Sequence, residues 1–344
     1  MGFFDSFKRE VKQSAVSFAH VISPNQAVWS NRDYKAFAKE AYIQNVVAYR
    51  SISRISEAVA SVRWEAWKGD EQLTEAPALS LLSSPSPFHS YSEFVAACVG
   101  YQMISGNNYV EFVDVGGKPA EMYSLRPDRM TIKASGSGVP SAYLYKVGNK
   151  SYTFEVDDSG ASAIHHSRLF NPLNDWYGMS PVEAGAYAVD QHTESMSWLQ
   201  ALLQNSARPS GALMAGDGVS LSDDQFDRVK NQIEEMYSGS GNAGRPMLLE
   251  GGMQWQQMGL SPSDVGIIDT KNSAARDICL AFGVPPQLLG IQGDNTYSNY
   301  QEARLSFWED TIIPLVISLQ ESLMQDISNR MDDGIVLKPN LDAV

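Results

Sequence analysis

The chain has 344 residues, of which 43% are hydrophobic, so it is long enough to bury one large core or two ordinary ones. Its 26 Lys and Arg residues stand against 40 Asp and Glu residues, which gives a net charge of −14 at pH 7. This balance excludes proteins that hold nucleic acid through a broad basic face, because such binding needs many cationic side chains to displace the counterions of phosphate.

The first half of the chain alternates between helical and strand patterns. Apolar residues at helical spacing predict a helix over 43–59, and Ser90 with Glu93 forms a capping box for a second helix that ends at Gly106. Runs of β-forming residues predict strands and a hairpin, at 62–68, 108–115, 128–133 and 142–156. These patterns together predict an α+β fold.

Long helices separated by turns are predicted in the second half. One helix runs over 181–205, and a capping box formed by Ser222 and Gln225 begins another that ends near residue 237. A small hairpin that turns at Gly251-Gly252 precedes a helix over 264–283. The helices on either side of this hairpin carry limited hydrophobic surface, so we expect their remaining faces to pack against other copies of the chain.

The stretch FGVPPQLLGIQGDNTYSNYQ predicts a helix end, a loop and a new helix. Gly283 and the two prolines after it end the first helix, and the loop that follows contains a single charged residue, Asp294. The last helical pattern contains Pro314. A proline inside a helix removes one backbone hydrogen bond and clashes with the carbonyl four residues earlier, at a cost of about 3 kcal/mol, so we expect a kink near Asp310.

The cysteines and the hydropathy of the chain indicate the cellular compartment in which it is made. Cys98 and Cys279 are the only cysteines, and both lie in apolar helical patterns, so we expect buried thiols rather than a disulfide or a metal site. The most apolar run, TIIPLVISL, is far shorter than the roughly 20 residues that cross a membrane. We therefore expect cytosolic synthesis and no membrane partner.

Motifs for catalysis are weak. His165 and His166 are adjacent in a predicted strand, where side chains point to opposite faces and do not readily share one metal ion. SGSGNAGRP is rich in glycine but lacks the Lys and Ser or Thr of a phosphate-binding loop. A carboxylate- or metal-dependent hydrolase would rest on these histidines and scattered acids alone, and a monomeric adaptor or scaffold would not explain the paired helices. We expect neither enzymatic activity nor a cofactor.

Several segments occur together in the order typical of one family. They are AYIQNVVAYRSISRISEAVASVRWEAW, HHSRLFNPLNDWYGMSPVEAG, FGVPPQLLG and NTYSNYQEARLSFWEDTIIPL. Over most of its length, the chain resembles the portal proteins of tailed bacteriophages. The resemblance implies a ring of about twelve copies at one capsid vertex, through which double-stranded DNA enters and leaves.

The resemblance also implies a role for each region. The implied regions are an N-terminal arm (1–24), a mixed α/β wing (25–220), two stem helices (221–237 and 264–283), a small β-containing clip (238–263), a tunnel loop (284–298), a kinked wing helix (299–330) and a short C-terminal segment (331–344). Many relatives continue beyond the equivalent of Val344, so we expect a crown that is reduced or absent.

Candidate site residues follow from these regions. The side chains expected to touch DNA in the tunnel loop are Gln292, Asp294, Asn295 and Asn299. The carboxylate of Asp294 would repel phosphate, and the amides of the other three would make weak hydrogen bonds that do not depend on base sequence. Compensating contacts on the stem are assigned to Arg228, Lys230, Lys271 and Arg276, although solvated helix faces or ion pairs between subunits explain any one of these more simply. The docking residues of the clip are Met253 and Trp255.

The implied partners belong to a virus particle. They are the large subunit of the terminase, which is the packaging motor, the head–tail adaptor proteins, the major capsid or scaffold protein, and double-stranded DNA without sequence specificity. The implied location is the portal vertex of the capsid, after assembly in the cytoplasm of a bacterial host.

Overall fold

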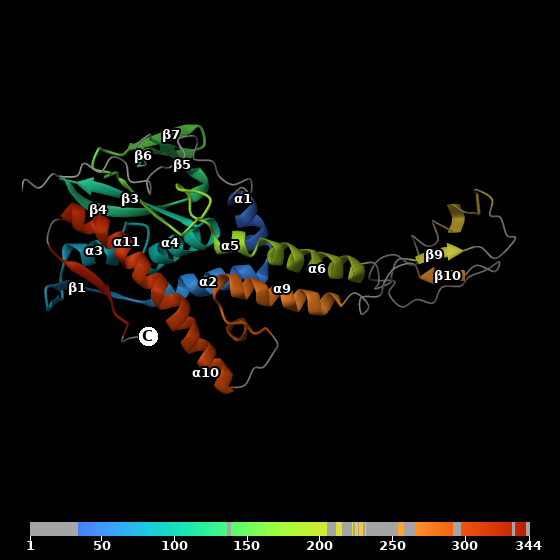
Figure 1. Ribbon diagram of the computed structural model, residues 1–344. Coiled ribbons are helices and arrows are strands. Elements are labelled where there is room, and N and C mark those ends of the chain that lie inside the picture. Colours follow the sequence, from blue (N-terminus) through green and yellow to red (C-terminus); the bar gives the residue numbers. More distant parts are fainter. Residues whose placement is uncertain are drawn as a thin grey trace, which may run out of the picture. The chain divides into compact units, whose positions relative to one another are not determined.

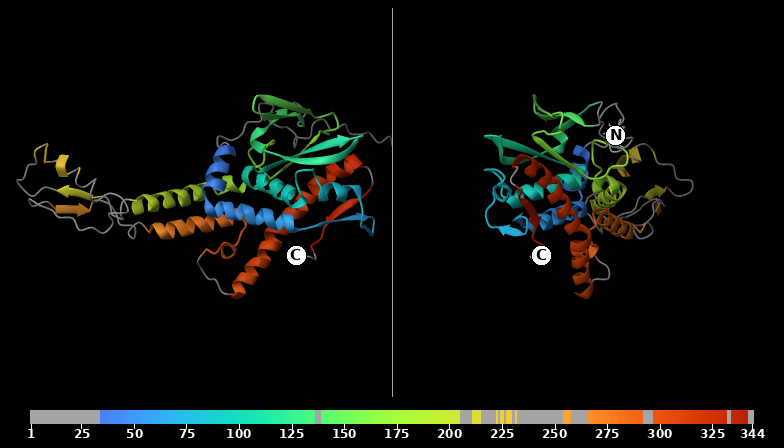
Figure 2. Two further views of the ribbon diagram at one scale, coloured as in Figure 1. Left: turned by 180° about the vertical axis from the view of Figure 1, so that it is seen from behind. Right: turned by 60° about the vertical axis from the view of Figure 1, so that its left-hand side comes forward.

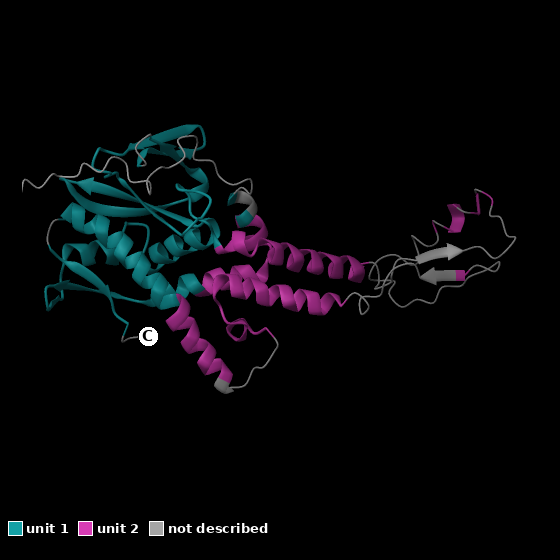
Figure 3. Ribbon diagram, viewed as in Figure 1, with its two compact units in different colours: residues 1–37, 55–180, 312–344 teal, residues 38–54, 181–311 magenta. Residues whose placement is uncertain are grey.

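The structure is a computed structural model, shown in Figure 1. It describes residues 34–135, 139–204, 211–214, 266–291, 297–331 and 334–341, with 222, 224–225, 227–229, 231 and 254–257 between them. The chain divides into two compact units (Figure 3). Unit 1 comprises Met1–Phe37, Ile55–Ser180 and Ile312–Val344, and unit 2 comprises Ala38–Arg54 and Pro181–Thr311. The fold is α+β, as predicted.

Unit 1 contains three antiparallel sheets of three strands each among its described residues, in the orders β4-β3-β8, β5-β6-β7 and β11-β1-β2. The strands are β1 (Trp64–Lys68), β2 (Glu71–Leu73), β3 (Asn107–Val115), β4 (Lys118–Leu125), β5 (Met130–Ala134), β6 (Pro140–Val147), β7 (Lys150–Glu155), β8 (Ile164–Arg168) and β11 (Val336–Pro339). The predicted strands are confirmed as β1, β3 and β5, and the predicted hairpin is β6–β7. The sequence patterns did not predict β2, β4 or β11.

Four α-helices lie wholly in unit 1 and a fifth lies in it in part. They are α1 (Tyr34–Phe37), α3 (Pro77–Ser83), α4 (Tyr91–Ser105), α11 (Ile313–Met331) and the part of α2 (Val46–Ser61) that follows Arg54. A short 3₁₀ helix, η3 (Pro127–Arg129), precedes β5. The predicted capping box of Ser90 and Glu93 begins α4, and Gly106 ends it in the left-handed conformation. Of the stripe predicted over 43–59, Ile55 and Val59 are buried, whereas Ile43, which precedes α2, and Val46, its first residue, are exposed.

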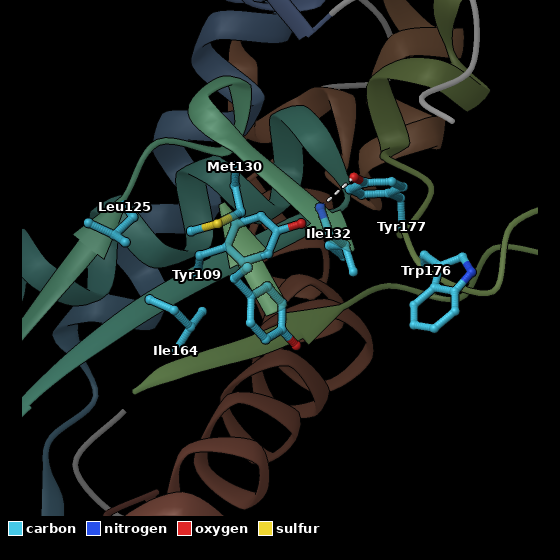
Figure 4. Close-up of a cluster of buried hydrophobic side chains, with 8 residues drawn as sticks. Tyr109, Leu125, Met130, Ile132, Ile164, Trp176 and Tyr177 are labelled. Carbon is cyan, nitrogen blue, oxygen red and sulfur yellow. Dashed lines mark hydrogen bonds between the residues drawn. The ribbon is translucent and has the colours of Figure 1, made fainter. Parts of the chain in front are cut away.

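Aromatic side chains dominate the core between the first two sheets of unit 1 (Figure 4). Tyr109 of β3 lies at its centre, fully buried, and the loop after β8 adds Trp176 and Tyr177. The backbone N–H of Ile132 donates a hydrogen bond of 3.0 Å to the Tyr177 hydroxyl. Burial of each large apolar side chain contributes about 1.5–3 kcal/mol, so this loop is part of the folded core rather than a surface connection.

Unit 2 is built on two long helices, α6 (Ala186–Gln204) and α9 (Ile267–Phe282), which pack side by side in both views of Figure 2. Its other described helical segments include the π-helical segment η2 (Ala38–Ile43), the short helix α5 (Pro181–Ala184), the 3₁₀ helix η5 (Pro286–Leu289), α10 (Tyr297–Ser306) and the part of α2 up to Arg54. Strands β9 (Gly211–Met214) and β10 (Gln254–Gln257) form a two-stranded antiparallel sheet.

The helix that packs along α9 differs from the predicted one. The sequence pattern paired 221–237 with 264–283, whereas α9 packs along α6, which the resemblance had placed in the wing. Among residues 221–237, those that the structure describes include the predicted capping box: Gln225 Oε1 accepts from the Ser222 N–H at 3.0 Å. The predicted turn at Gly251-Gly252 lies outside the described residues, and β10 pairs with β9.

The predicted disturbance of the last helix takes the form of a π-helical turn. This turn, η6 (Phe307–Ile312), lies between α10 and α11 and includes Asp310. Pro314 follows it in the first turn of α11 and is exposed. A π-helical turn shifts the backbone hydrogen bonds by one residue, and this shift accommodates the donor that Pro314 lacks.

Both cysteines are buried free thiols, as predicted. Burial raises the pKa of Cys98 to about 12 and that of Cys279 to about 11, so neither is a reactive thiolate at neutral pH. Within the described part of the chain, no helix has the length and apolar character needed to span a bilayer.

Candidate functional site

Asn45 joins the start of α2 to α6 in unit 2. Its Oδ1 accepts hydrogen bonds from the backbone N–H groups of Val47 and Ala48, both at 3.1 Å, and so caps α2. Its Nδ2 lies 3.2 Å from His192 Nδ1 and 3.2 Å from Thr193 Oγ1, both on α6. A single buried amide therefore connects two helices that are far apart in sequence.

His192 completes this connection as a neutral ring. Its side chain is 3% exposed, and its pKa is lowered first by burial and second by the positive charge of Lys271 on α9. Because Asn45 Nδ2 is a donor, His192 Nδ1 must accept, which requires the tautomer with its proton on Nε2. A lowered pKa favours this neutral form, so at neutral pH the uncharged His192 ring can lie at the joint between α2, α6 and α9 without repulsion from the positive charge of Lys271.

Small residues allow α9 to lie close to the start of α6. A Cβ placed on Gly185, between α5 and α6, would lie only 3.1 Å from the Cβ of Ala281. The buried face of α9 consists of Ala274, Ala275, Ile278, Cys279 and Phe282. Close approach of the two helices increases their dispersion contacts and makes the pair a stiff element.

The same helix pair also exposes large apolar side chains. They are Tyr187, Met196, Trp198 and Leu203 on α6, and Ile268 and Leu280 on α9. Leu280 is 80% exposed, only one residue after the fully buried Cys279. Monomeric proteins rarely leave this much apolar surface on neighbouring elements in contact with water, so these side chains indicate a contact with another chain.

The loop after α9 is anchored at its first residue. Gly283 ends α9 with φ 65°, and a Cβ there would lie 2.8 Å from Thr311 Oγ1. The Thr311 hydroxyl donates a hydrogen bond of 2.6 Å to the Gly283 carbonyl. The chain then forms η5 and a left-handed turn at Gly290, which has φ 73°. Residues 284–291 are thus ordered by local contacts rather than forming an open loop throughout.

The structure places the predicted site residues as follows. Asn299 lies in the first turn of α10 rather than in a loop, while Gln292, Asp294 and Asn295 lie outside the described residues. Lys271 and Arg276 are on α9, where Lys271 is half-buried beside His192 and Arg276 is exposed. Arg228 is exposed in a helical segment, Trp255 is in β10 paired with Leu213, and Lys230 and Met253 lie outside the described residues.

The two adjacent histidines have structural contacts on opposite faces of β8. His165 Nε2 lies 3.1 Å from Ser322 Oγ, and His165 Nδ1 contacts Asp326, so this ring fastens β8 to α11. His166 stacks on Tyr109 with ring centroids 4.4 Å apart. Asp, His and Ser are the residue types of a hydrolytic triad, but Ser322 lies inside α11, where backbone N–H groups bond within the helix and do not form an oxyanion hole.

Across the residues that the structure describes, no group of three or more His, Cys, Asp or Glu side chains could hold a metal ion. Asp175, Asp190 and Glu194 are exposed, and Glu183 is half-buried. Asp190 and Glu194 are four residues apart on α6 and are neighbours on its surface, but they form a pair only. The hydrolase alternative therefore receives no support from the geometry of the described chain.

Sequence reasoning missed α6 as the partner of α9. The helical patterns over 181–205 and 264–283 were a usable indication, because they lie on either side of one intervening segment. The pairing of β9 with β10 was also missed, since GALM is too short to be distinguished from a loop by its pattern.

Comparison with known proteins agrees with the resemblance. The profile of the phage portal protein family matches residues 46–344. An uncharacterized protein of Rickettsia felis is 38% identical over 342 residues, covering 98% of this chain and 88% of that protein. The portal protein of enterobacteria phage HK97 is 23% identical over 317 residues, covering 89% of this chain and 72% of that protein.

Solved structures give the same result. A chain in the neck of an empty gene transfer agent particle, computed with C6 symmetry, has a TM-score of 0.75 and 38% identity, and the match covers 95% of this chain and 89% of that one. A chain in the neck of a native particle, computed with C12 symmetry, has a TM-score of 0.71 and 39% identity, with 94% and 88% coverage.

A more distant structure has the same fold. An HK97-family phage portal protein from Corynebacterium diphtheriae has a TM-score of 0.62 at 17% identity, and the match covers 88% of this chain and 96% of that one. Portal proteins are structural and non-enzymatic. The matched profile covers most of the chain, and the fold agrees with it: the chain belongs to the phage portal protein family.

Proposed function

We propose that this chain forms a closed ring of about twelve copies at the neck of a virus-like particle, and that double-stranded DNA passes through the ring during packaging and ejection. The observation that carries the proposal is the likeness, at 39% identity, to a chain in a gene transfer agent neck computed with C12 symmetry. Exposed apolar side chains on α6 and α9 supply the surface that such a ring would bury.

Within this proposal, α6 and α9 are the stem, in place of the pair 221–237 and 264–283. The segment between them, which includes β9 and β10, is the clip, where terminase, the packaging motor, and the head–tail adaptor proteins would dock. The wing contacts the capsid or scaffold protein. Two helices packed closely through small residues suit a channel wall, because a stiff wall keeps its bore while DNA moves.

The tunnel loop, 284–298, starts from the anchored Gly283 and approaches DNA. A net charge of −14 and the acid at Asp294 suit a conduit that holds DNA loosely, since strong phosphate contacts would retain it. Arg228 and Arg276, both exposed, are the stronger candidates for compensating contacts. Lys271, half-buried beside His192, is better explained by the helix joint.

Assembly is tested by native mass spectrometry and negative-stain imaging of the purified chain. We expect rings of about twelve copies, with some other sizes when no capsid protein limits closure. A monomer at micromolar concentration, in buffer that keeps the chain folded, would contradict the proposal.

The conduit is tested by Asp294→Lys, which places about twelve new positive charges around one circle. Because the residue lies in a polar segment, we expect rings to form normally and the amount of encapsidated DNA per particle to change, with an effect that weakens as salt is raised. Asp294→Asn is the matched control for loss of the acid alone. Equal packaging by wild type and Asp294→Lys at low salt would mean that this residue does not face DNA.

Docking is tested by Trp255→Asp and Met253→Asp. If 238–263 is the docking surface, rings should stay intact while the motor or adaptor protein binds more weakly, because apolar anchors dominate such contacts. Loss of the ring, with partner binding unchanged in any residual oligomer, would place these residues in a core instead.

A further inference from the structure

Strand β7 is an exposed edge of the sheet β5-β6-β7. It pairs with β6 alone among the strands that the structure describes, in an unbroken register from Val147↔Lys150 to Ala142↔Glu155. Five of its six residues are exposed, including Tyr152, which is 49% exposed.

The outward hydrogen-bonding groups of β7 follow from one contact. Just beyond the strand, the backbone N–H of Val156 donates to the Ser141 carbonyl at 3.1 Å, so Val156 faces β6. Antiparallel strands alternate between residues that face the partner and residues that face away. Ser151, Thr153 and Glu155 therefore direct their N–H and C=O groups away from β6, as a row that an added strand can use.

Natural edge strands usually carry a device that prevents pairing. The common devices are a β-bulge, a proline, a very short strand or a charged side chain, especially Lys. On β7 the charged residues, Lys150 and Glu155, lie only at its two ends. β7 has no register shift against β6, contains no proline and is six residues long. Its middle, Tyr152, Thr153 and Phe154, consists of strong β-formers. The edge is thus regular and ready for pairing.

A polar pocket lies at the Glu155 end of this edge. Its volume is about 810 Å³, and Glu155 itself lines it, together with the turn after β7 and the last turns of α11. Three carboxylates line the pocket, from Glu155, Asp157 and Asp326, against one guanidinium, from Arg330. The last outward-facing residue of the edge is therefore also a wall of the pocket.

The charges of this pocket are fixed by local contacts. Asp157 Oδ1 accepts from the Ser159 hydroxyl at 2.6 Å and from the Ala161 N–H at 2.9 Å, and these bonds lower the pKa of Asp157, which keeps it ionised. Arg330 is already engaged by the Ser162 carbonyl and lies 3.5 Å from Asp114. The pocket end of the edge is therefore acidic, whereas Lys146 and Lys150 lie at the opposite, turn end.

We propose that the β7 edge binds an extended segment of a different polypeptide as an added antiparallel strand, with a basic residue near the N-terminus of that segment placed in the pocket. Antiparallel pairing puts the N-terminal end of the added strand beside Glu155, and the acidic pocket matches a Lys or Arg side chain there. Main-chain hydrogen bonds to Ser151, Thr153 and Glu155 supply affinity, and the charge gradient sets the direction of the segment.

The test uses a synthetic fluorescein-labelled peptide, KKTVTVTE, and the full chain, with binding followed by fluorescence anisotropy. We expect saturable binding, which the charge-reversed peptide EETVTVTK and a peptide N-methylated at alternate residues do not show. Thr153→Pro should abolish binding while the fold is kept, because the Thr153 N–H does not bond to β6. Glu155→Lys should weaken binding at least about 5-fold. Glu71→Lys, which changes an exposed acid on β2 of another sheet, is the matched control and should bind as wild type does.

Three outcomes would overturn this inference. The first is absence of binding, or binding that neither Thr153→Pro nor Glu155→Lys alters. The second is self-association that Thr153→Pro removes, which would make a second copy of the chain the occupant. The third is binding that appears only after residues 1–33 are removed, which would make the chain's own N-terminal segment the occupant. The measurement does not depend on ring formation, so its failure leaves the proposed portal function unaffected.

Discussion

At the scale of single residues, Gly178 is where the loop after β8 meets the end of α4. A Cβ on Gly178 would lie 2.0 Å from the Gly106 carbonyl oxygen, a backbone atom that also accepts from the Leu169 N–H at 2.8 Å. The Gly178 N–H in turn donates to Asn107 Oδ1 at 2.8 Å. Neither side of this contact can move without the loss of a buried hydrogen bond.

We therefore expect Gly178→Ala to lower the free energy of unfolding by about 3 kcal/mol or more. Gly100→Ala is the matched control, because Gly100 is inside α4 and its nearest added contact is 3.7 Å away, so it should be neutral or stabilise by about 0.5–1 kcal/mol. Denaturant unfolding monitored by circular dichroism measures both. Equal stability of Gly178→Ala and wild type would contradict the tight contact.

His192 makes stability depend on pH. Its folded-state pKa is lowered by burial and by Lys271, so below the ordinary histidine pKa the unfolded chain binds a proton that the folded chain does not. Stability that is present at neutral pH is therefore lost as pH falls below about 6.5, by up to about 1.4 kcal/mol per pH unit. His192→Gln keeps an acceptor for Asn45 without a titrating group, and we expect a smaller loss between pH 7 and pH 5. Parallel curves for the two proteins in thermal melts would exclude this role.

At the scale of elements, the α6–α9 pair has one face buried within unit 2 and an apolar face in water. Leu280→Asp places a charge on the exposed face of α9 without touching its buried face. We expect rings to be lost or much reduced, while the stability of the monomer changes by no more than about 0.5 kcal/mol. Asn272→Asp, an isosteric change that adds the same charge about 80° around α9 from Leu280, is the control and should assemble. Size-exclusion chromatography with light scattering distinguishes the two, and a Leu280→Asp ring of full size would place the interface elsewhere.

At the scale of the whole molecule, the acidic balance limits how DNA can be held. With a net charge of −14, the chain should bind linear double-stranded DNA weakly, and the logarithm of the binding constant should fall with the logarithm of salt with a slope of about −3 or shallower. Filter binding over a salt series measures this slope. A slope near −6 or steeper would show an extended basic face, which is incompatible with a conduit that releases DNA.

Local patterns by themselves determined many of the individual elements of this protein, though not β2, β4, β9 or β11, and they carried the resemblance to its family. The capping box of Ser90 and Glu93, the end of α9 at Gly283 and the β6–β7 hairpin depend on contacts between residues a few positions apart, which a sequence displays directly. The placement of the His165 and His166 side chains on opposite faces of β8 follows from the same kind of local pattern, because side chains alternate along a strand.

Only the tertiary structure decided which elements meet. Asn45 and His192 are 147 residues apart, and nothing in either local pattern indicates that they share a hydrogen bond. The pairing of α9 with α6 and the pocket between the turn after β7 and α11 arise in the same way, from burial of complementary faces contributed by distant segments. One chain allows many such combinations, and the choice among them depends on packing, which is a property of the folded molecule and not of any window of sequence.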